Sequence, residues 1–246
     1  MTNLNKQYEP LAWSDFFDSK DMIDETVPIY TAGEKGHVFV CLHGAGHSAM
    51  SFAALAQNMK AKSTVVAFDF RGHGLHYCEN ETNLSQEILL ADTLKVLEHT
   101  RKRFEGRTLI IVGHSMGGSI AAKVASKIEN EMAGSDLAKA VNGLFVIDVV
   151  EGTAMDALPF MEQIVKNRPA NFPDYKSVIR YGIQSGQVKD LISARVSMPA
   201  QVVEKTNEAT GQMQLEWRTD LLASQQFWTE WFKDLTSTFL AIKMKK

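Results

Sequence analysis

The sequence predicts an α/β fold, with a mostly parallel sheet, flanking helices and a helical cap, and two observations carry this prediction. Between residues 27 and 150, short runs rich in β-branched and aromatic residues alternate with spacers of helix length. Runs that are apolar at nearly every position are typical of strands buried on both faces, and helical crossovers make neighbouring strands parallel. From Glu151 onward, helical patterns separated by Pro, Gly and Asn prevail, which predicts a cap of helices over the sheet.

Each expected element follows from a stretch of this kind. A polar, acidic N-terminal arm ends near Thr26, and a helix is expected after Ser85, a favourable N-cap residue. The residues of that helix that should face the core are Leu90, Ala91, Leu94 and Leu97. The strands are expected at 27–30, 37–43, 63–70, 108–114 and 143–150. We divide this single structural unit into a core at 1–150, a cap at 151–240 and a basic tail at 241–246.

Composition and charge narrow the classes of function. A chain of 246 residues buries a sizeable core, and one domain with a small cap is expected. Its formal net charge of -3 gives no electrostatic reason to expect nucleic acid or a membrane as partner. The opening residues lack the apolar core of a signal peptide, so a cytoplasmic or nuclear location is expected. Cys41 lies in an apolar run and Cys78 in a polar loop, which favours free thiols over a disulfide.

The stretch GHSMG at 113–117 predicts a nucleophilic serine. It matches the G-x-S-x-G pattern and has the context that this pattern requires, a strand before Ser115 and a helix after it. In such a turn the backbone passes so close to its neighbours that no side chain fits at Gly113 or Gly117. The start of the following helix favours the negative charge that forms on a substrate oxygen. We therefore expect Ser115 to attack an ester carbonyl.

The stretch HGAG at 43–46 directly follows an expected strand and predicts an oxyanion-binding loop. In ester hydrolases of this fold, an N–H group from such a loop joins the N–H group of the residue after the nucleophile to hold the oxyanion. Here the two donors would be Ala45 and Met116. Gly44 and Gly46 keep the amides of the loop accessible, and His43 is expected to shape the loop.

Asp148 is the expected acid of the site. It lies toward the end of the last expected strand, and ligands bind in the crevice outside the carboxyl ends of parallel strands. Its role would be to orient a histidine. The competing carboxylate is Asp69, which with Arg71 and His73 is expected to tie together the loop after its own strand.

The histidine that should complete the site is absent from its expected place. In this fold the residues follow the chain order Ser, Asp or Glu, His, yet no histidine follows Ser115. His114 should point away from the nucleophile, because side chains alternate along a strand. Another histidine could substitute only with a ring nitrogen within about 3 Å of the serine hydroxyl, and the candidates are His43, His47 and His76.

Four further stretches carry a resemblance to a known family: YEPLAWSDFFD, LHGAGHSAMSF, IDVVEGTAMDAL and SGQVKDLISARVSMPAQVV. Together with GHSMGG they resemble the protein phosphatase methylesterases, α/β-hydrolases that remove the methyl ester from the C-terminal leucine of the type 2A phosphatase catalytic subunit. The similarity runs from about Tyr8 to about Leu240. It implies the α/β-hydrolase fold, Ser115 as nucleophile, Asp148 as acid, the HGAG loop as oxyanion site and the phosphatase as partner.

The resemblance also implies where the missing histidine lies. In the family it follows two further strands of the sheet and precedes a final helix, whereas this chain ends with AIKMKK, where the first of those strands should begin. We therefore expect a C-terminally truncated form with very weak catalysis. The run at 143–150 should then form an exposed apolar edge of the sheet, and poor solubility should follow.

Two alternatives to a methylesterase remain at this point. The elbow and the oxyanion loop also suit a small-molecule carboxylesterase, and the missing histidine favours a protein that binds the phosphatase without chemistry. Neither needs a cofactor, and no group of His, Cys and acidic residues has convincing metal-ligand spacing. Arg195 in the cap is a candidate for binding a peptide carboxylate, although an ion pair is the commoner role of a lone arginine.

Overall fold

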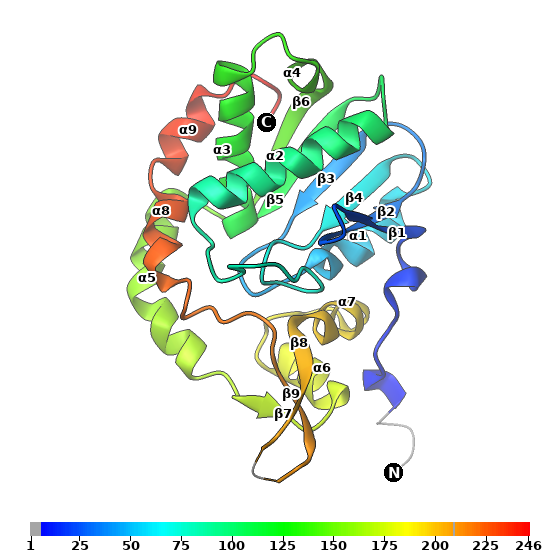
Figure 1. Cartoon of the computed structure of the whole chain (residues 1–246), viewed down its shortest axis with the longest axis vertical. Coiled ribbons are helices and arrows are strands. Elements are labelled where there is room, and N and C mark those ends of the chain that lie inside the picture. Colours follow the sequence, from blue (N-terminus) through cyan, green and yellow to red (C-terminus); the bar gives the residue numbers. More distant parts are fainter. Residues whose placement is uncertain (1–5, 209) are drawn as a thin grey trace.

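The computed structural model describes residues 6–208 and 210–246. Within them, six strands form one sheet in the order β1-β2-β4-β3-β5-β6, and a second sheet has the order β7-β9-β8. Figure 1 shows the large sheet with its helices in the upper part of the molecule and the small sheet, with α6 and α7, below it. The α/β fold that the sequence predicts, with a mostly parallel sheet and flanking helices, is confirmed.

The large sheet is mostly parallel. β4, β3, β5 and β6 run in parallel, whereas β1 and β2 join them in antiparallel pairs at one edge. All five expected strands are present. β1 is an additional strand within the polar arm, and Ile23 is the only buried residue of that strand. The strands are β1 (Ser19–Ile23), β2 (Val27–Ala32), β3 (Val38–Leu42), β4 (Thr64–Phe68), β5 (Leu109–His114) and β6 (Val141–Ile147).

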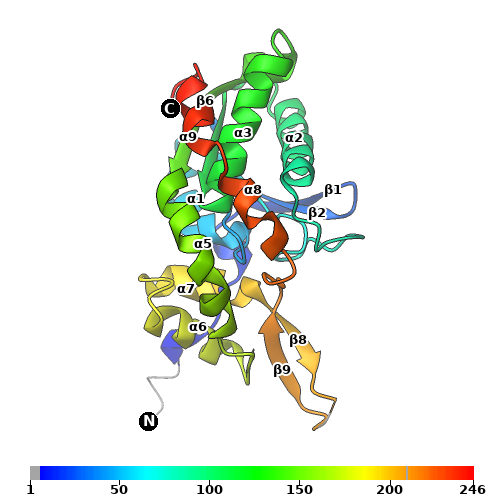
Figure 2. The ribbon, with the colours of Figure 1, turned by 90° about the vertical axis from the view of Figure 1, so that its left-hand side faces the viewer.

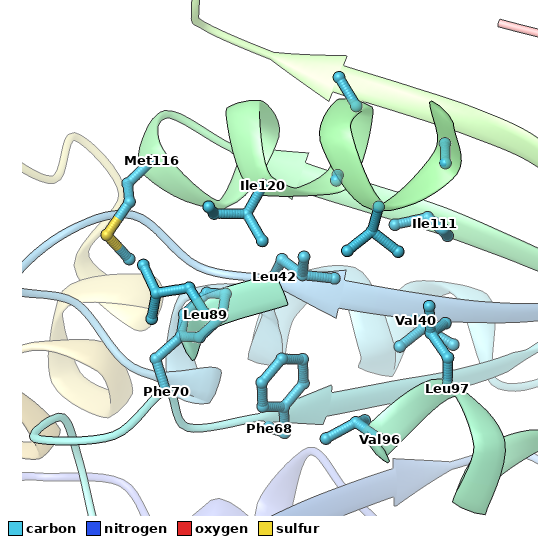
Figure 3. Packing of buried hydrophobic residues seen from close by; sticks show 14 of the residues in the cluster. Val40, Leu42, Phe68, Phe70, Leu89, Val96, Leu97, Ile111, Met116 and Ile120 are labelled. Carbon is cyan, nitrogen blue, oxygen red and sulfur yellow. The ribbon is translucent and has the colours of Figure 1, made fainter. Parts of the chain in front are cut away.

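Helices cover both faces of this sheet because successive side chains of each strand point to opposite faces. Val40 and Leu42 of β3 pack toward α2 (Gln86–Arg103) and α3 (Met116–Glu131), as Figure 3 shows, whereas Cys41 belongs to the cluster on the other face. That second face is covered by α1 (Ala53–Met59) and α7 (Leu191–Ser197). Short 3-10 helices lie at Lys6–Tyr8, Trp13–Asp15, Ala49–Phe52, Pro199–Gln201 and Gln225–Phe227.

The cap contains strands as well as the helices expected from the sequence. The antiparallel sheet β7-β9-β8 lies in the region where no strand was predicted, because its strands are short and partly charged. Figure 2 shows the hairpin of β8 and β9 projecting from the lower end of the molecule. The elements of the cap are α5 (Glu151–Lys166), β7 (Asn171–Phe172), α6 (Tyr175–Gln184), α7, β8 (Val202–Thr206) and β9 (Met213–Trp217).

The chain returns to the core before the expected end of the cap at residue 240. α8 (Trp228–Phe232) and α9 (Leu235–Ala241) pack against α3, and Trp231 and Leu235 are buried in the main core cluster. The carboxylate of Glu151, at the start of α5, accepts hydrogen bonds from the N–H groups of Asp234 and Thr236 at 2.9 and 2.8 Å. The place where the chain leaves the core is therefore joined to the place where it re-enters.

The edge strand β6 is partly open. α4 (Asp136–Ala140) leads into it, and its side chains Phe145 and Ile147 are 54% and 43% exposed on the face that α1 covers elsewhere. The residues expected as a free basic tail instead reach this edge: Lys245 forms a parallel bridge with Gly143, and its carbonyl accepts the N–H of Leu144 at 2.8 Å. The bridge covers only part of the edge, and Phe145 and Ile147 leave apolar surface exposed there, as the sequence predicts.

Candidate active site

Ser115 lies in a strained turn between β5 and α3. Its φ of 53° and ψ of -121° are values that residues other than glycine rarely adopt, at a cost of about 1–3 kcal/mol. The turn is held by its own hydrogen bonds: the N–H of Ser115 donates to the carbonyl of Ile147 at 3.0 Å, and the carbonyl of Ser115 accepts from Gly118 and Ser119. The hydroxyl is thereby fixed at the start of α3, where the sequence predicts the nucleophile.

The two glycines that flank the serine stand where no side chain fits. A Cβ atom on Gly113 would lie 2.2 Å from the carbonyl oxygen of Gly117, and one on Gly117 would lie 2.3 Å from the carbonyl oxygen of Leu42. Both distances are far inside van der Waals contact with the backbone of β3 and α3. The spacing of the G-x-S-x-G pattern is therefore set by the close approach of these segments.

Two backbone amides at the cavity of Ser115 lack a hydrogen-bond acceptor. The N–H groups of Ala45 and Met116 donate to no other residue in the described ranges, and both residues line the same cavity as Ser115. The amide of Gly46, by contrast, donates to Nε2 of His73 at 3.0 Å, in a loop turned by the positive φ of Gly46. Ala45 and Met116 are thus available to an oxyanion, whereas Gly46 shapes the loop.

Asp69 and the histidines around it hold the loops rather than the substrate. The Asp69 carboxylate accepts the N–H groups of Ala49 at 2.7 Å and Leu75 at 3.0 Å, and burial raises the pKa of Asp69 to about 6. Nδ1 of His73 donates to the carbonyl of Arg71, whose guanidinium pairs with Asp92 at 2.6 Å. The loop role interpreted for Asp69, Arg71 and His73 fits these contacts.

Two of the three candidate substitute histidines are occupied by the backbone. Nε2 of His43 accepts the N–H of Phe70 at 3.0 Å while Nδ1 donates to the carbonyl of Gly44, and burial holds the pKa of His43 well below its usual value. Nδ1 of His76 donates to the carbonyl of Asp69 at 2.9 Å. His43 and His76 therefore serve the loops on which they lie.

His47 is the third candidate, and it lines the cavity of Ser115. Its Nδ1 pairs with the hydroxyl of Ser51 at 3.2 Å, and Nε2 makes no hydrogen bond within the described residues. Burial, and then the nearby His114 and Arg168, lower the pKa of His47 to about 4. Its ring is therefore neutral near pH 7, a state in which a nitrogen can accept a proton but is only weakly basic.

Asp148 follows β6 and lies at the rim of the same cavity. It has a positive φ of 52°, its side chain is 88% exposed, and its Oδ2 lies 3.9 Å from Nε2 of His114. The ring of His114 lies beside the HGAG loop, since a Cβ atom on Gly44 would meet that ring at 3.0 Å and Cβ of Ser115 at 3.3 Å. His114 is not among the residues that line the cavity of Ser115, and its orientation away from the serine stays a prediction.

The cavity at Ser115 has a volume of about 370 Å³ and mostly apolar walls. The core supplies the polar end described above, and the opposite walls come from the helices. Those wall residues were not singled out from the sequence, although Ala154, Leu158 and Met161 recur at the spacing of one helix face. The apolar walls comprise Ala154, Ala157, Leu158, Met161, Leu221, Trp228, Trp231 and Phe232.

A second cavity of about 370 Å³ lies between the N-terminal arm and the cap, lined by Trp13, Tyr30 and Asp69 among others. Its polar groups are already engaged: Asp69 accepts the two amides described above, and the hydroxyl of Ser48 accepts the N–H of Met50. No strained nucleophile faces it. The candidate site is therefore the cavity at Ser115.

Metal and membrane chemistry find no support in the described part of the chain. No group of three or more His, Cys, Asp or Glu side chains in residues 6–208 and 210–246 is arranged to hold a metal ion. Cys41 and Cys78 are free thiols, and burial raises the pKa of the Cys41 thiol. Across the same residues, no helix has the length and apolar character needed to cross a bilayer.

Comparisons with known proteins agree with this geometry. The alpha/beta hydrolase family profile matches residues 39–242. The chain is 35% identical to the probable protein phosphatase methylesterase 1 of Caenorhabditis elegans, 31% to protein phosphatase methylesterase 1 of Bos taurus and 34% to that of Schizosaccharomyces pombe. The chain belongs to the protein phosphatase methylesterases of the alpha/beta hydrolase family. These alignments cover 98%, 98% and 96% of the chain.

The coverage of the relatives is smaller. The chain spans 64% of the length of the C. elegans protein, 73% of the B. taurus protein and 70% of the S. pombe protein. Among solved structures, E-2-(acetamidomethylene)succinate hydrolase matches with a TM-score of 0.66 at 22% identity over 89% of this chain and 74% of that one. An esterase of Mycobacterium tuberculosis matches with a TM-score of 0.62 at 19% identity, over 92% of this chain and 71% of its own. These structures support the fold.

Proposed function

We propose that the Ser115 site acts on the methyl ester of the C-terminal leucine of the type 2A phosphatase catalytic subunit. The observation that carries the proposal is the strained Ser115, which lines an apolar cavity together with two residues whose amides lack acceptors. The names of the relatives support the class of substrate. We propose the type 2A catalytic subunit as the particular phosphatase because the resemblance of the sequence implies it.

Each group has a role in the proposed reaction. The hydroxyl of Ser115 attacks the ester carbonyl, and the oxygen that becomes negative is stabilised by the N–H groups of Ala45 and Met116. The bond to the methoxy group then breaks, and methanol leaves with the proton that the serine gave up. Water next attacks the acyl group on Ser115 and releases the leucine carboxylate.

The walls of the cavity suit the side chain of leucine. A leucine that passes from water into apolar surroundings gains about 1.5–3 kcal/mol. The cavity presents Leu158, Met161 and Leu221 from the cap side and Trp228 from α8, so an isobutyl group meets carbon on several sides. A charged side chain in the same place would lose its water and find no counter-charge on these walls.

The polypeptide of residues 1–246 lacks an efficient base, and we propose that its turnover is very slow. Within residues 6–208 and 210–246, His114 is the one histidine ring within 4 Å of Asp148, and it lies 3.9 Å away and packs against the HGAG loop. Loss of the histidine of a serine hydrolase triad lowers turnover by about a million-fold. The lack of an efficient base in residues 1–246 also favours the second candidate function, which is binding of the phosphatase without chemistry.

A serine-directed probe tests the proposed function. The purified chain is treated with a fluorophosphonate, and the same is done with Ser115→Ala. We expect slow labelling of the parent chain and none of the variant, together with slow methanol release from a leucine methyl ester peptide. Equal labelling of both proteins would refute Ser115 as nucleophile. A folded parent chain that is never labelled, yet retains the phosphatase in a pull-down, would favour the binding role.

A further inference from the structure

Arg168 lies where the cap meets the catalytic core. It follows the end of α5, and its N–H donates to the carbonyl of Val165 at 3.2 Å. Its guanidinium stacks on the indole of Trp217 in β9, 4.0 Å from the ring centroid. The indole is fixed in turn, since its Nε1 donates to the carbonyl of Pro169 at 2.8 Å. The plane of the guanidinium is therefore set before any ligand arrives.

The guanidinium of Arg168 has no counter-charge. Its Nε atom is buried and lacks a hydrogen-bond partner, and within residues 6–208 and 210–246 it forms no ion pair. Burial lowers the pKa of Arg168, and the nearby Tyr181 partly offsets this effect. Two other arginines that are buried or half-buried are paired: Arg71 with Asp92, and Arg218 with Glu81 at 2.7 Å. Because a buried charge without a partner is costly, an arginine in this state is poised for an anion.

The free cation lies beside the Ser115 cavity. A Cβ atom on Gly46, in the HGAG loop, would come within 3.7 Å of Nη1 of Arg168 and 3.0 Å of Cδ1 of Leu221. Leu221 is part of the cavity wall, and so is His47, whose pKa the charge of Arg168 helps to lower. A ligand that occupies the cavity therefore passes within reach of this guanidinium.

We propose that Arg168 binds a carboxylate of the ligand and makes the Ser115 site selective for acid-bearing peptides. This inference rests on the proposed function, in which the ligand is a peptide that ends in leucine. The two terminal Nη groups of an arginine match the two oxygens of a carboxylate, and an aromatic ring stacked on one face leaves the edge of the guanidinium that carries them uncovered by that ring. Two sources offer such a group: an acidic side chain near the end of the peptide, or the leucine carboxylate that hydrolysis releases.

The arginine considered from the sequence, Arg195, is not available for this role. Its Nε donates to the carbonyl of Glu9 at 2.6 Å, and its own carbonyl accepts the N–H of Leu11 at 3.0 Å. Arg195 thus ties the N-terminal arm to α7, which is neither the carboxylate site nor the ion pair that the sequence suggested. Arg168 was missed because nothing in the sequence marks an arginine as unpaired.

Peptide binding tests the inference. In a Ser115→Ala background, which prevents turnover, the affinity is measured by titration calorimetry for hexapeptides that end in leucine. Three of the peptides are neutral and end in a methyl ester, a free carboxylate or an amide. Three more carry the methyl ester and a single aspartate at one of the three positions before the leucine. The comparison is with Arg168→Gln, and Arg180→Gln is the matched control, because Arg180 also stacks on an aromatic ring of the arm, Tyr8, at 5.1 Å.

We expect Arg168→Gln to weaken peptides with a carboxylate by about tenfold to a hundredfold, as loss of a charge-assisted hydrogen bond does, and to leave the neutral ester and amide unchanged. Loss for the aspartate peptides alone identifies the side chain as the source, and loss for the free acid alone identifies the product. Arg180→Gln should change none of them. Arg168→Lys, which keeps the charge and the stem, should lie between the parent and the glutamine variant.

Three outcomes overturn the inference: equal loss for all peptides, no loss for any, or no binding of any peptide to the parent. If Arg168→Gln fails to fold, Arg168→Lys and the salt dependence of the parent decide, since added salt should weaken only the carboxylate peptides. Failure of the proposed function would give a different binding result. The acidic peptides would then bind through Arg168, while the methyl ester gains nothing over the amide.

Discussion

The two halves of the candidate site differ in how firmly the chain holds them. The nucleophile half, from the HGAG loop to the start of α3, is enclosed: Met116 is buried, and Gly117 touches the backbone of β3. The acid half, at the end of β6, is open, and the side chain of Asp148 is 88% exposed at a partly uncovered edge. The proposed nucleophile and oxyanion donors thus lie in packed backbone, whereas the proposed acid is exposed, and the histidine nearest to it among the described residues, His114, lies 3.9 Å away.

The difference shows which part of an enzyme a short motif can encode. The elbow and the oxyanion loop are formed by neighbouring segments of β3, β5 and α3, which the core holds in place. The relay of a proton needs a histidine from a distant part of a chain, and no local pattern replaces it. Three predictions test this contrast between the nucleophile half and the acid half of the site.

The largest effect is expected from Gly117→Ala. The new methyl group would overlap the carbonyl of Leu42, and we expect a loss of about 3 kcal/mol or more in the free energy of unfolding, or failure to fold. The matched control is Gly152→Ala in the first turn of α5, where a Cβ atom meets nothing within 4 Å and where alanine favours the helix. Urea unfolding measures both. A Gly117→Ala protein as stable as the parent would refute the tight packing of the elbow.

A smaller effect, on rate alone, is expected from His47→Gln. If His47 is the residual base, this variant should lower fluorophosphonate labelling of Ser115 by about tenfold to a hundredfold without lowering stability. Since the pKa of His47 is about 4, the basic form prevails at every pH above 5, so the labelling rate of the parent should stay flat from pH 5.5 to 8. A fall in rate with a midpoint near pH 6.5 would assign the residual rate to another histidine.

The smallest effect is expected from Asp148→Asn. Because the carboxylate lies 3.9 Å from Nε2 of His114 and orients no base, labelling of Ser115 should change less than about threefold. Stability should also stay within about 0.5 kcal/mol, as for most exposed side chains. A loss of more than tenfold in labelling would show that Asp148 acts through His114 in this polypeptide, and the contrast between the two halves would fail.

The sequence predicted the strands of the core well because each is a continuous apolar run. It missed β1, whose side chains are polar or exposed except for Ile23, since an edge strand needs no such run. It predicted the core-facing side of α2 in part: Leu97 is buried and Leu90 and Leu94 pack against the core, whereas Ala91 is exposed. The pattern did not single out Leu89, Thr93 and Val96, which are also buried. Because apolar residues lie on more than one side of α2, the sequence pattern alone does not show which of them face the sheet.

The polar end of the candidate site was also predictable, and its walls were not. Ser115, Ala45, Met116 and Asp148 were placed from two motifs and one strand end, and the structure brings all four to one cavity. The walls come from α5, which ends at Lys166 and is closely followed by Arg168, and from α8, which begins only at Trp228. Their meeting is a property of tertiary packing, which spacing within a segment cannot express.

The carboxylate of Glu151 has a consequence for how such a protein can change over evolution. It joins the residue where the chain leaves the sheet to the residues where the chain returns, by hydrogen bonds to Asp234 and Thr236. A segment whose two ends meet behaves as an insertion, and insertions of this kind can be replaced without disturbing the host. The cap elements from α5 to β9 therefore form an exchangeable insertion: new ligand preferences can arise by changes within residues 152–217, while α8 and the serine turn stay as they are.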